Sequence, residues 1–164
     1  MPLDDQHAWT LLHSLDDPDH LEFPRGYNHS AARARFDQLA THLEHSFDCT
    51  CDVDRQVQDA TRHGTIVIPN NATASPDQIT ITVSNFGNLI VTSLGDPGAY
   101  DADEERELLL SDDRDRIEQA LNGLGLVAIS QHLLEAPYDG KNDSLRAAYP
   151  GHTRTWWIRF FDYI

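Results

Sequence analysis

Lysine is almost missing from this sequence: Lys141 is the only one, and every other basic residue is an arginine. The 164 residues include 12 basic and 27 acidic side chains, which gives a formal net charge of −15. Nucleic acids and anionic membranes attract proteins through lysine and arginine. This charge therefore argues against both as direct partners.

Long apolar runs are also missing. No run approaches the roughly 20 apolar residues that a membrane-spanning helix needs. The first residues, MPLDDQH, are acidic and lack the apolar core of a secretory signal. We therefore expect a cytoplasmic protein.

The motifs of the common catalytic and cofactor-binding sites are lacking. The sequence has no G-x-S-x-G, no G-x-x-x-x-G-K-S/T, no H-E-x-x-H and no G-x-G-x-x-G. We therefore predict no cofactor, and a binding protein is favoured over an enzyme.

Four potential metal ligands lie close together in the sequence: His42, His45, Cys49 and Cys51. The two histidines project away from the apolar stripe of the predicted helix, whereas the two cysteines occupy the apolar face of the predicted strand that follows. We expect no metal site and two buried thiols without a disulfide. The Cα atoms of residues i and i+2 in a strand are separated by a distance at the upper limit of what a disulfide can span. Asp48, Asp52 and Asp54 share a strand face, but no calcium-loop pattern follows them, so a charged edge strand explains them better.

Hydrophobic periodicity predicts a single α+β domain over residues 1–164, in the order α-α-β-β-β-β-α-β-β. Short connections between the middle strands favour a mainly antiparallel sheet of about six strands, with two or three helices packed against it. The predicted helices are residues 3–15, 30–46 and 101–122, the last with a break near Ser111. The predicted strands are residues 47–57, 65–68, 79–84, 89–94, 125–134 and 153–164.

The last dozen residues, TRTWWIRFFDYI, organise this predicted fold. In a strand they would present apolar side chains on both faces, which is typical of a central strand covered on both sides. Arg159 and Asp162 interrupt the pattern, so each is expected to meet a polar partner or the margin of the sheet.

The acidic residues are concentrated in two blocks. Residues 1–22 contain six acids and no lysine or arginine, and residues 96–118 contain ten acids and three arginines. A codon bias or a salty cytoplasm would spread the acids evenly, so the blocks favour a functional origin. Like charges spaced three or four residues apart on a helix repel, and a basic partner would relieve that repulsion. The predicted partner-binding residues are Asp101, Asp103, Glu104, Glu105, Glu107, Asp112, Asp113 and Asp115.

A small acidic α+β domain without catalytic motifs resembles the bacterial immunity proteins in its overall character. Proteins of that kind neutralise a toxin by binding it, and many of those toxins are basic nucleases. The resemblance is one of composition and implies no role for any single residue. Our first hypothesis is therefore a non-enzymatic protein of immunity or antitoxin type that binds a basic protein.

Two alternatives remain. One is a small enzyme or ligand-binding domain with a pocket between sheet and helices near the insertion of residues 135–152. This alternative implies a hydrolytic or acid–base reaction there. Its predicted pocket residues are His132, Tyr138, Asp139, His152, Trp156 and Trp157. The other alternative is a structural or oligomeric subunit.

Overall fold

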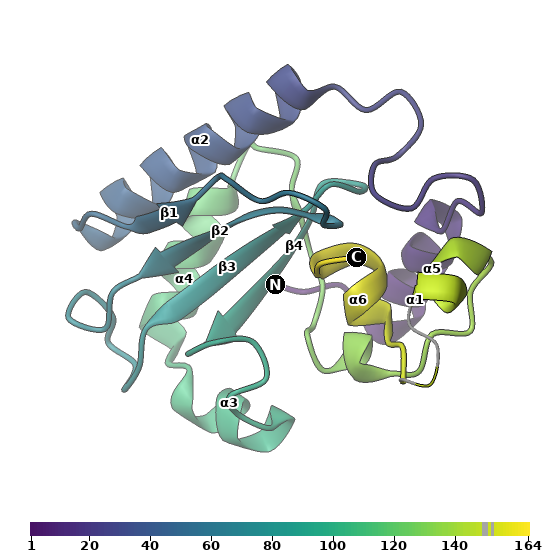
Figure 1. Cartoon of the computed structure of the whole chain (residues 1–164). Helices are drawn as coiled ribbons and strands as arrows, with labels where there is room; N and C mark the ends of the chain where they lie inside the picture. Colours follow the sequence, from purple (N-terminus) through teal and green to yellow (C-terminus); the bar gives the residue numbers. More distant parts are fainter. Residues whose placement is uncertain (149–150, 152) are drawn as a thin grey trace.

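One five-stranded sheet forms the centre of the computed structural model, which describes residues 1–148, 151 and 153–164 (Figure 1). The strands lie in the order of the chain: β1 (Asp52–Asp54), β2 (Arg62–Ile68), β3 (Ile79–Ser84), β4 (Leu89–Leu94) and β5 (Val127–Ala128). Strands β1 to β4 pair antiparallel, whereas β5 pairs parallel with β4. The predicted α+β class is confirmed, but the sheet is mixed and has five strands, not mainly antiparallel with about six.

Within the described residues, six α-helices surround the sheet. They are α1 (Asp5–Leu15), α2 (His29–Phe47), α3 (Ala102–Leu108), α4 (Ser111–Leu121), α5 (Asp143–Ala148) and α6 (Trp156–Phe161), with a short 3-10 turn, η1 (Leu133–Glu135), between β5 and α5. No helix in the described part of the chain is long and apolar enough to cross a membrane.

Two hydrophobic clusters hold these elements together. The first cluster lies between the sheet and the helices α2 and α4, and includes Phe36, Leu43, Ile81 and Ile117. The second cluster joins α1 and α6 to the other side of the sheet, where Phe86 and Phe160 meet with their ring centroids 5.3 Å apart. In β4, Ile90 belongs to the first cluster and the adjacent Val91 to the second, as the alternation of side chains in a strand requires.

The final segment is a helix, and the prediction of a central strand there is wrong. Thr155 caps α6 by accepting a hydrogen bond from the backbone N–H of Ile158 at 3.5 Å. Trp156, Arg159 and Phe160 are then spaced i, i+3 and i+4, so they share one buried helical face. A short run that is apolar on both strand faces cannot be told from a buried helix by its periodicity.

Two other predicted strands are much shorter than expected. Helix α2 extends to Phe47, so only Asp52–Asp54 of the predicted strand 47–57 pairs with β2. The predicted strand 125–134 is reduced to Val127–Ala128. The N-terminal segment meets it there, because the N–H of Leu3 donates to the carbonyl of Ala128 at 3.0 Å.

Two connections fall where the predicted elements leave a gap or a break. The hairpin between β3 and β4 has positive φ at Gly87 (57°) and Asn88 (58°), which suits the twist of a tight β-hairpin. The long acidic helix is broken between α3 and α4. Ser111 is the first residue of α4. The N-cap of this helix is Leu110, which makes no side-chain capping hydrogen bond.

Candidate functional site

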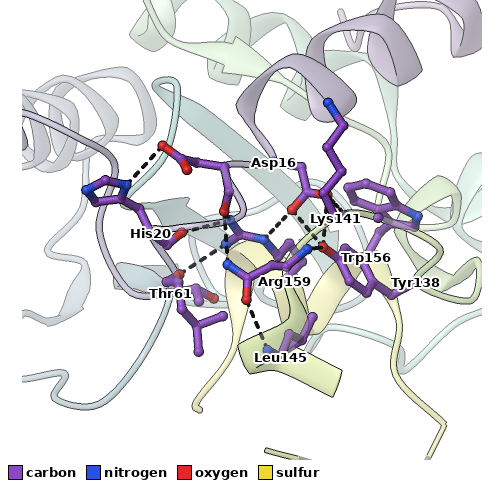
Figure 2. A network of polar contacts seen from close by, with 12 residues as sticks. Asp16, His20, Thr61, Tyr138, Lys141, Leu145, Trp156 and Arg159 are labelled. Carbon is purple, nitrogen blue, oxygen red and sulfur yellow. Dashed lines mark hydrogen bonds and ion pairs between the residues drawn. The ribbon is translucent and has the colours of Figure 1, made fainter. Parts of the chain in front are cut away.

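A buried ion pair joins the C-terminal helix α6 to the end of α1 (Figure 2). Nε of Arg159 lies 2.7 Å from Oδ1 of Asp16, and both side chains are 0% exposed. Arg159 also donates to the carbonyls of Asp17, His20 and Leu21 at 3.2, 2.9 and 3.0 Å. Arg159, which interrupts the apolar pattern of residues 153–164, was expected to meet a polar partner, and that partner is Asp16, which is distant in sequence.

The Asp16 carboxylate also accepts hydrogen bonds from residues outside α6. Its carboxylate accepts hydrogen bonds from the Tyr138 hydroxyl at 2.7 Å and from the N–H of Lys141 at 2.7 Å. Burial raises the pKa of Tyr138 to about 12, so the phenol stays protonated as a donor. Because both charges are paired and hydrogen-bonded inside the fold, this network stabilises the packing of α6 on α1.

The pocket predicted near the insertion is divided between two places. Tyr138 and Trp156 are buried in the second hydrophobic cluster with ring centroids 4.8 Å apart, and the indole N–H of Trp156 donates to Asp139 at 3.2 Å. Trp157 is half-buried and stacks on Phe161. These rings are part of the core and do not form an open wall.

The remaining two residues of that predicted pocket lie elsewhere. Nε2 of His132 is 3.5 Å from Oε1 of Glu105, which links η1 to α3. His152 lies outside the described residues. The structure therefore does not assemble His132, Tyr138 and Trp156 into one site.

Three residues of the acidic segment stabilise the fold. Asp101 and Glu104 form a capping box at the start of α3: Oδ1 of Asp101 accepts from the N–H of Glu104, whose carboxylate accepts from the N–H of Asp101. Asp113 is 0% exposed and accepts from the N–H groups of Ala74 and Ser75 at 3.0 and 2.7 Å. Asp113 therefore does not belong to an exposed docking surface, contrary to the prediction.

Glu105 is also largely enclosed. Its carboxylate accepts hydrogen bonds from the N–H of Leu94 at 3.1 Å and from the Gln131 side chain at 2.5 Å, besides the contact with His132. Glu105, like Asp113, therefore has a structural role inside the fold. Four of the predicted partner-binding residues remain exposed without such a role: Asp103, Glu107, Asp112 and Asp115.

A groove of about 1060 Å³ runs between the N-terminal segment, the helices α3 and α4, and the segment from β5 to η1. Its apolar lining includes Trp9, Leu109, Ile117, Leu121 and Leu133. Its acidic lining consists of Asp5, Glu105, Asp115 and Glu118, of which Glu118 forms an ion pair with the N-terminal amino group of Met1. Arg106 and Arg114 also line it, but Arg106 pairs with Asp103 at 3.1 Å and Arg114 donates to the carbonyl of Arg106 at 2.9 Å. We call this feature the acidic groove.

A second concave region lies at the start of α2 and was not found from the sequence. Two cavities of about 230 and 290 Å³ share Tyr27, His63 and Asn85 in their linings. The Tyr27 hydroxyl donates to Oδ1 of Asn85 at 3.1 Å and lies 3.1 Å from Nδ1 of His63. Burial raises the pKa of Tyr27 to about 12 and lowers the pKa of His63, so both side chains are neutral at pH 7.

The cysteines lie near each other at the end of α2. Sγ of Cys49 and Sγ of Cys51 are 4.0 Å apart, and both thiols are free. Burial raises the pKa of Cys51 to about 12, which keeps it a thiol. Among the described residues, no group of three His, Cys, Asp or Glu side chains is arranged to hold a metal ion.

Comparisons with known proteins return no match: no protein-family model, no curated protein and no solved structure is significantly similar to this chain.

Proposed function

We propose that this chain is a non-enzymatic binding protein, of immunity or antitoxin type, that binds a basic protein partner at the acidic groove. One observation supports this proposal above the others. The groove is bordered by both acid-rich blocks of the sequence, with Asp5 from the first block on one side and Asp115 and Glu118 from the second on the other. Two segments about a hundred residues apart therefore supply charge to one concave surface.

The chemistry of the groove suits a protein partner that is both basic and partly apolar. Apolar side chains such as Trp9, Leu121 and Leu133 line its interior, and burial of such surface contributes most of the affinity in protein complexes. Asp115 lines the groove, and Glu107 and Asp112 follow its lining residues Arg106 and Ser111 in the sequence; these three exposed acids would steer a basic partner and accelerate association.

The test replaces only acids that the fold does not use. In the groove variant, Glu107, Asp112 and Asp115 all become Lys. These side chains are exposed, and the main structural cost is a cation in the first turn of α4, about 0.3 to 1 kcal/mol. In the control variant, the exposed Asp19, Asp52 and Asp59 become Lys, so both variants gain the same net charge.

The natural protein, the groove variant and the control variant are each immobilised and used to capture partners from a lysate of the native host. A captured protein counts only if the groove variant loses it and the control retains it. Its association rate with each purified protein is then measured by surface plasmon resonance at low salt. We expect association with the groove variant to be at least about tenfold slower than with the control. Equal association rates for the two variants would refute a docking role for the groove.

A further inference from the structure

The arginines of this acidic chain are concentrated around the two cavities at the start of α2. Five of the 12 basic residues line them: Arg25 and Arg35 in one cavity, and Arg33, Arg55 and Arg62 in the other. The only acidic residue in either lining is Glu22. The linings of the two cavities are therefore positively charged, although the protein as a whole has a net charge of −15.

Several of these guanidinium groups retain free donors. The side chains of Arg25 and Arg33 are exposed, and neither guanidinium donates a hydrogen bond to another described residue. Nε of Arg62 is buried and finds no hydrogen-bond partner in the described part of the chain, while its guanidinium lies 4.4 Å from the ring centroid of Tyr163. A buried donor without an acceptor costs free energy unless a ligand supplies one. Arg55, by contrast, is already paired with Asp37 at 2.7 Å.

The amino end of α2 adds positive potential to the same place. The N-cap Asn28 and the early helix residues Ala31 and Ala32 line the first cavity. This helix has 19 residues and no acidic residue in its first turn, so nothing within that turn offsets the positive end of its dipole. The N–H groups of Ala31 and Ala32 already donate to Asn28, so the helix start contributes its dipole, and that dipole together with the arginines beside it suits an oxyanion.

Neutral polar groups lie where the two cavities meet. Because the Tyr27 hydroxyl gives its proton to Asn85, it accepts from Nδ1 of His63, and this places the lone pair of the imidazole on Nε2. The Asn85 side chain is held in turn by the carbonyls of Glu22 and Ala60 at 3.2 and 3.1 Å. The junction is thus a fixed surface between the loop before α2, β2 and the β3–β4 turn.

From the charge, the free donors and the cavities together, we infer that this region is a binding site for a phosphate group. The planar guanidinium fork matches two phosphate oxygens, and several arginines around one cavity suit a dianion better than a single carboxylate. Cavities of about 230 and 290 Å³ are large enough for a phosphate and a small attached group. The two linings share no residue with the acidic groove, so this site is independent of the proposed partner surface.

The test uses titration calorimetry of the full chain in a phosphate-free buffer at low salt, with inorganic phosphate and adenosine 5′-monophosphate as probes. We expect both probes to bind the natural protein at concentrations below about 10 mM, a range well within calorimetric reach. A monophosphate that binds about tenfold more tightly than inorganic phosphate would identify an organic phosphate as the ligand. Equal affinities would identify the phosphate group alone, and both results support the site.

Two double variants decide whether the arginines are responsible. Arg25→Gln with Arg33→Gln removes two exposed side chains that bond to no described residue, so the fold should persist, as an unchanged melting temperature would verify. Binding should weaken by about tenfold or more, the usual effect of losing charged hydrogen bonds. The control, Arg106→Gln with Arg146→Gln, removes the same charge from two exposed sites outside the cavities and should bind almost as the natural protein does. Absence of binding of either probe at about 10 mM, or equal weakening in the two variants, would overturn the inference.

Discussion

Replacing Arg159 by Leu tests the buried network on which the position of α6 depends. The substitution leaves Asp16 in the interior, where its side chain is 0% exposed, with only the Tyr138 hydroxyl and the Lys141 N–H as donors. It also leaves three backbone carbonyls, of residues 17, 20 and 21, without the donors they have now. Breaking one side of a buried, hydrogen-bonded charge pair costs about 3 to 5 kcal/mol.

The assay is denaturation in urea, monitored by tryptophan fluorescence. This probe suits α6 because Trp156 belongs to that helix and lies in the second hydrophobic cluster. A loss of about 3 to 5 kcal/mol would be a large part of the roughly 5 to 15 kcal/mol that holds a typical domain folded. Arg159→Lys keeps a charge but not the planar fork, so its loss should be intermediate. The exposed pair of Arg106 and Asp103 is the matched control, and Arg106→Leu should change the free energy of unfolding by less than about 1 kcal/mol.

The reasoning would be refuted if Arg159→Leu lowered the free energy of unfolding by less than about 1 kcal/mol. Such a result would mean that the leucine and its apolar neighbours replace the ion pair without cost, or that α6 does not pack on α1 as described. The double variant with Asp16→Leu tests the cause of the expected loss. If it recovers stability relative to Arg159→Leu alone, the unpaired charge was the cause of the loss.

Two further predictions concern single side chains. Phe160→Ala should lower the free energy of unfolding by about 3 to 5 kcal/mol, whereas Trp157→Ala should cost less, because Phe160 is 0% exposed and Trp157 is only half-buried; equal losses in denaturation experiments would contradict this packing. Burial lowers the pKa of His63 in the folded protein, so its imidazole binds a proton more readily in the unfolded chain. The free energy of unfolding should therefore fall as the pH drops from about 7.5 through about 6.5 towards the lowered pKa of the folded state. His63→Gln should reduce that fall, and an identical pH profile for the natural protein and the variant would contradict the burial of this ring.

Local patterns predicted the helices and hairpin that depend on neighbours in sequence. The apolar stripe that includes Phe36 and Leu43 lies on the buried face of α2, and Gly123, with a positive φ of 79°, follows the end of α4. The start of α2 was less predictable: the predicted helix begins at residue 30, whereas Asn28 caps α2 by accepting from the N–H of Ala31 at 3.0 Å. A capping residue competes with equally suitable neighbours, so the sequence alone leaves its position open by one or two residues.

The final segment shows where such patterns fail. Six consecutive residues from Trp156 to Phe161 satisfy the burial requirement of a strand and of a helix equally well, and the decision depends on a partner more than a hundred residues away. Arg159 can be buried only in a geometry that reaches Asp16 and the carbonyls of the loop after α1. The sequence showed that this arginine needed a partner, but not which of the many acids supplied it.

The site at the start of α2 was missed for a related reason. Its arginines come from the loop before α2, from α2 itself and from the β1–β2 region, and no spacing along the chain connects them. A count of charges by sequence block shows residues 1–22 and 96–118 as acidic, and leaves the rest of the chain close to neutral. The near neutrality of that remainder conceals a cluster of arginines that only the fold brings together.

The same partition of charge bears on both proposed surfaces. Asp16, Glu105 and Asp113 count towards the net charge, yet each is saturated by hydrogen bonds inside the fold, so the exposed field of the acidic blocks comes from the remaining acids. Those acids stay largely unneutralised because five of the 12 basic side chains surround the cavities at α2. An even distribution of arginine would weaken the attraction of the acidic groove for a basic protein and would abolish the positive cavity as well. Gathering the arginines in one place therefore favours a basic partner at one surface and an anion at another.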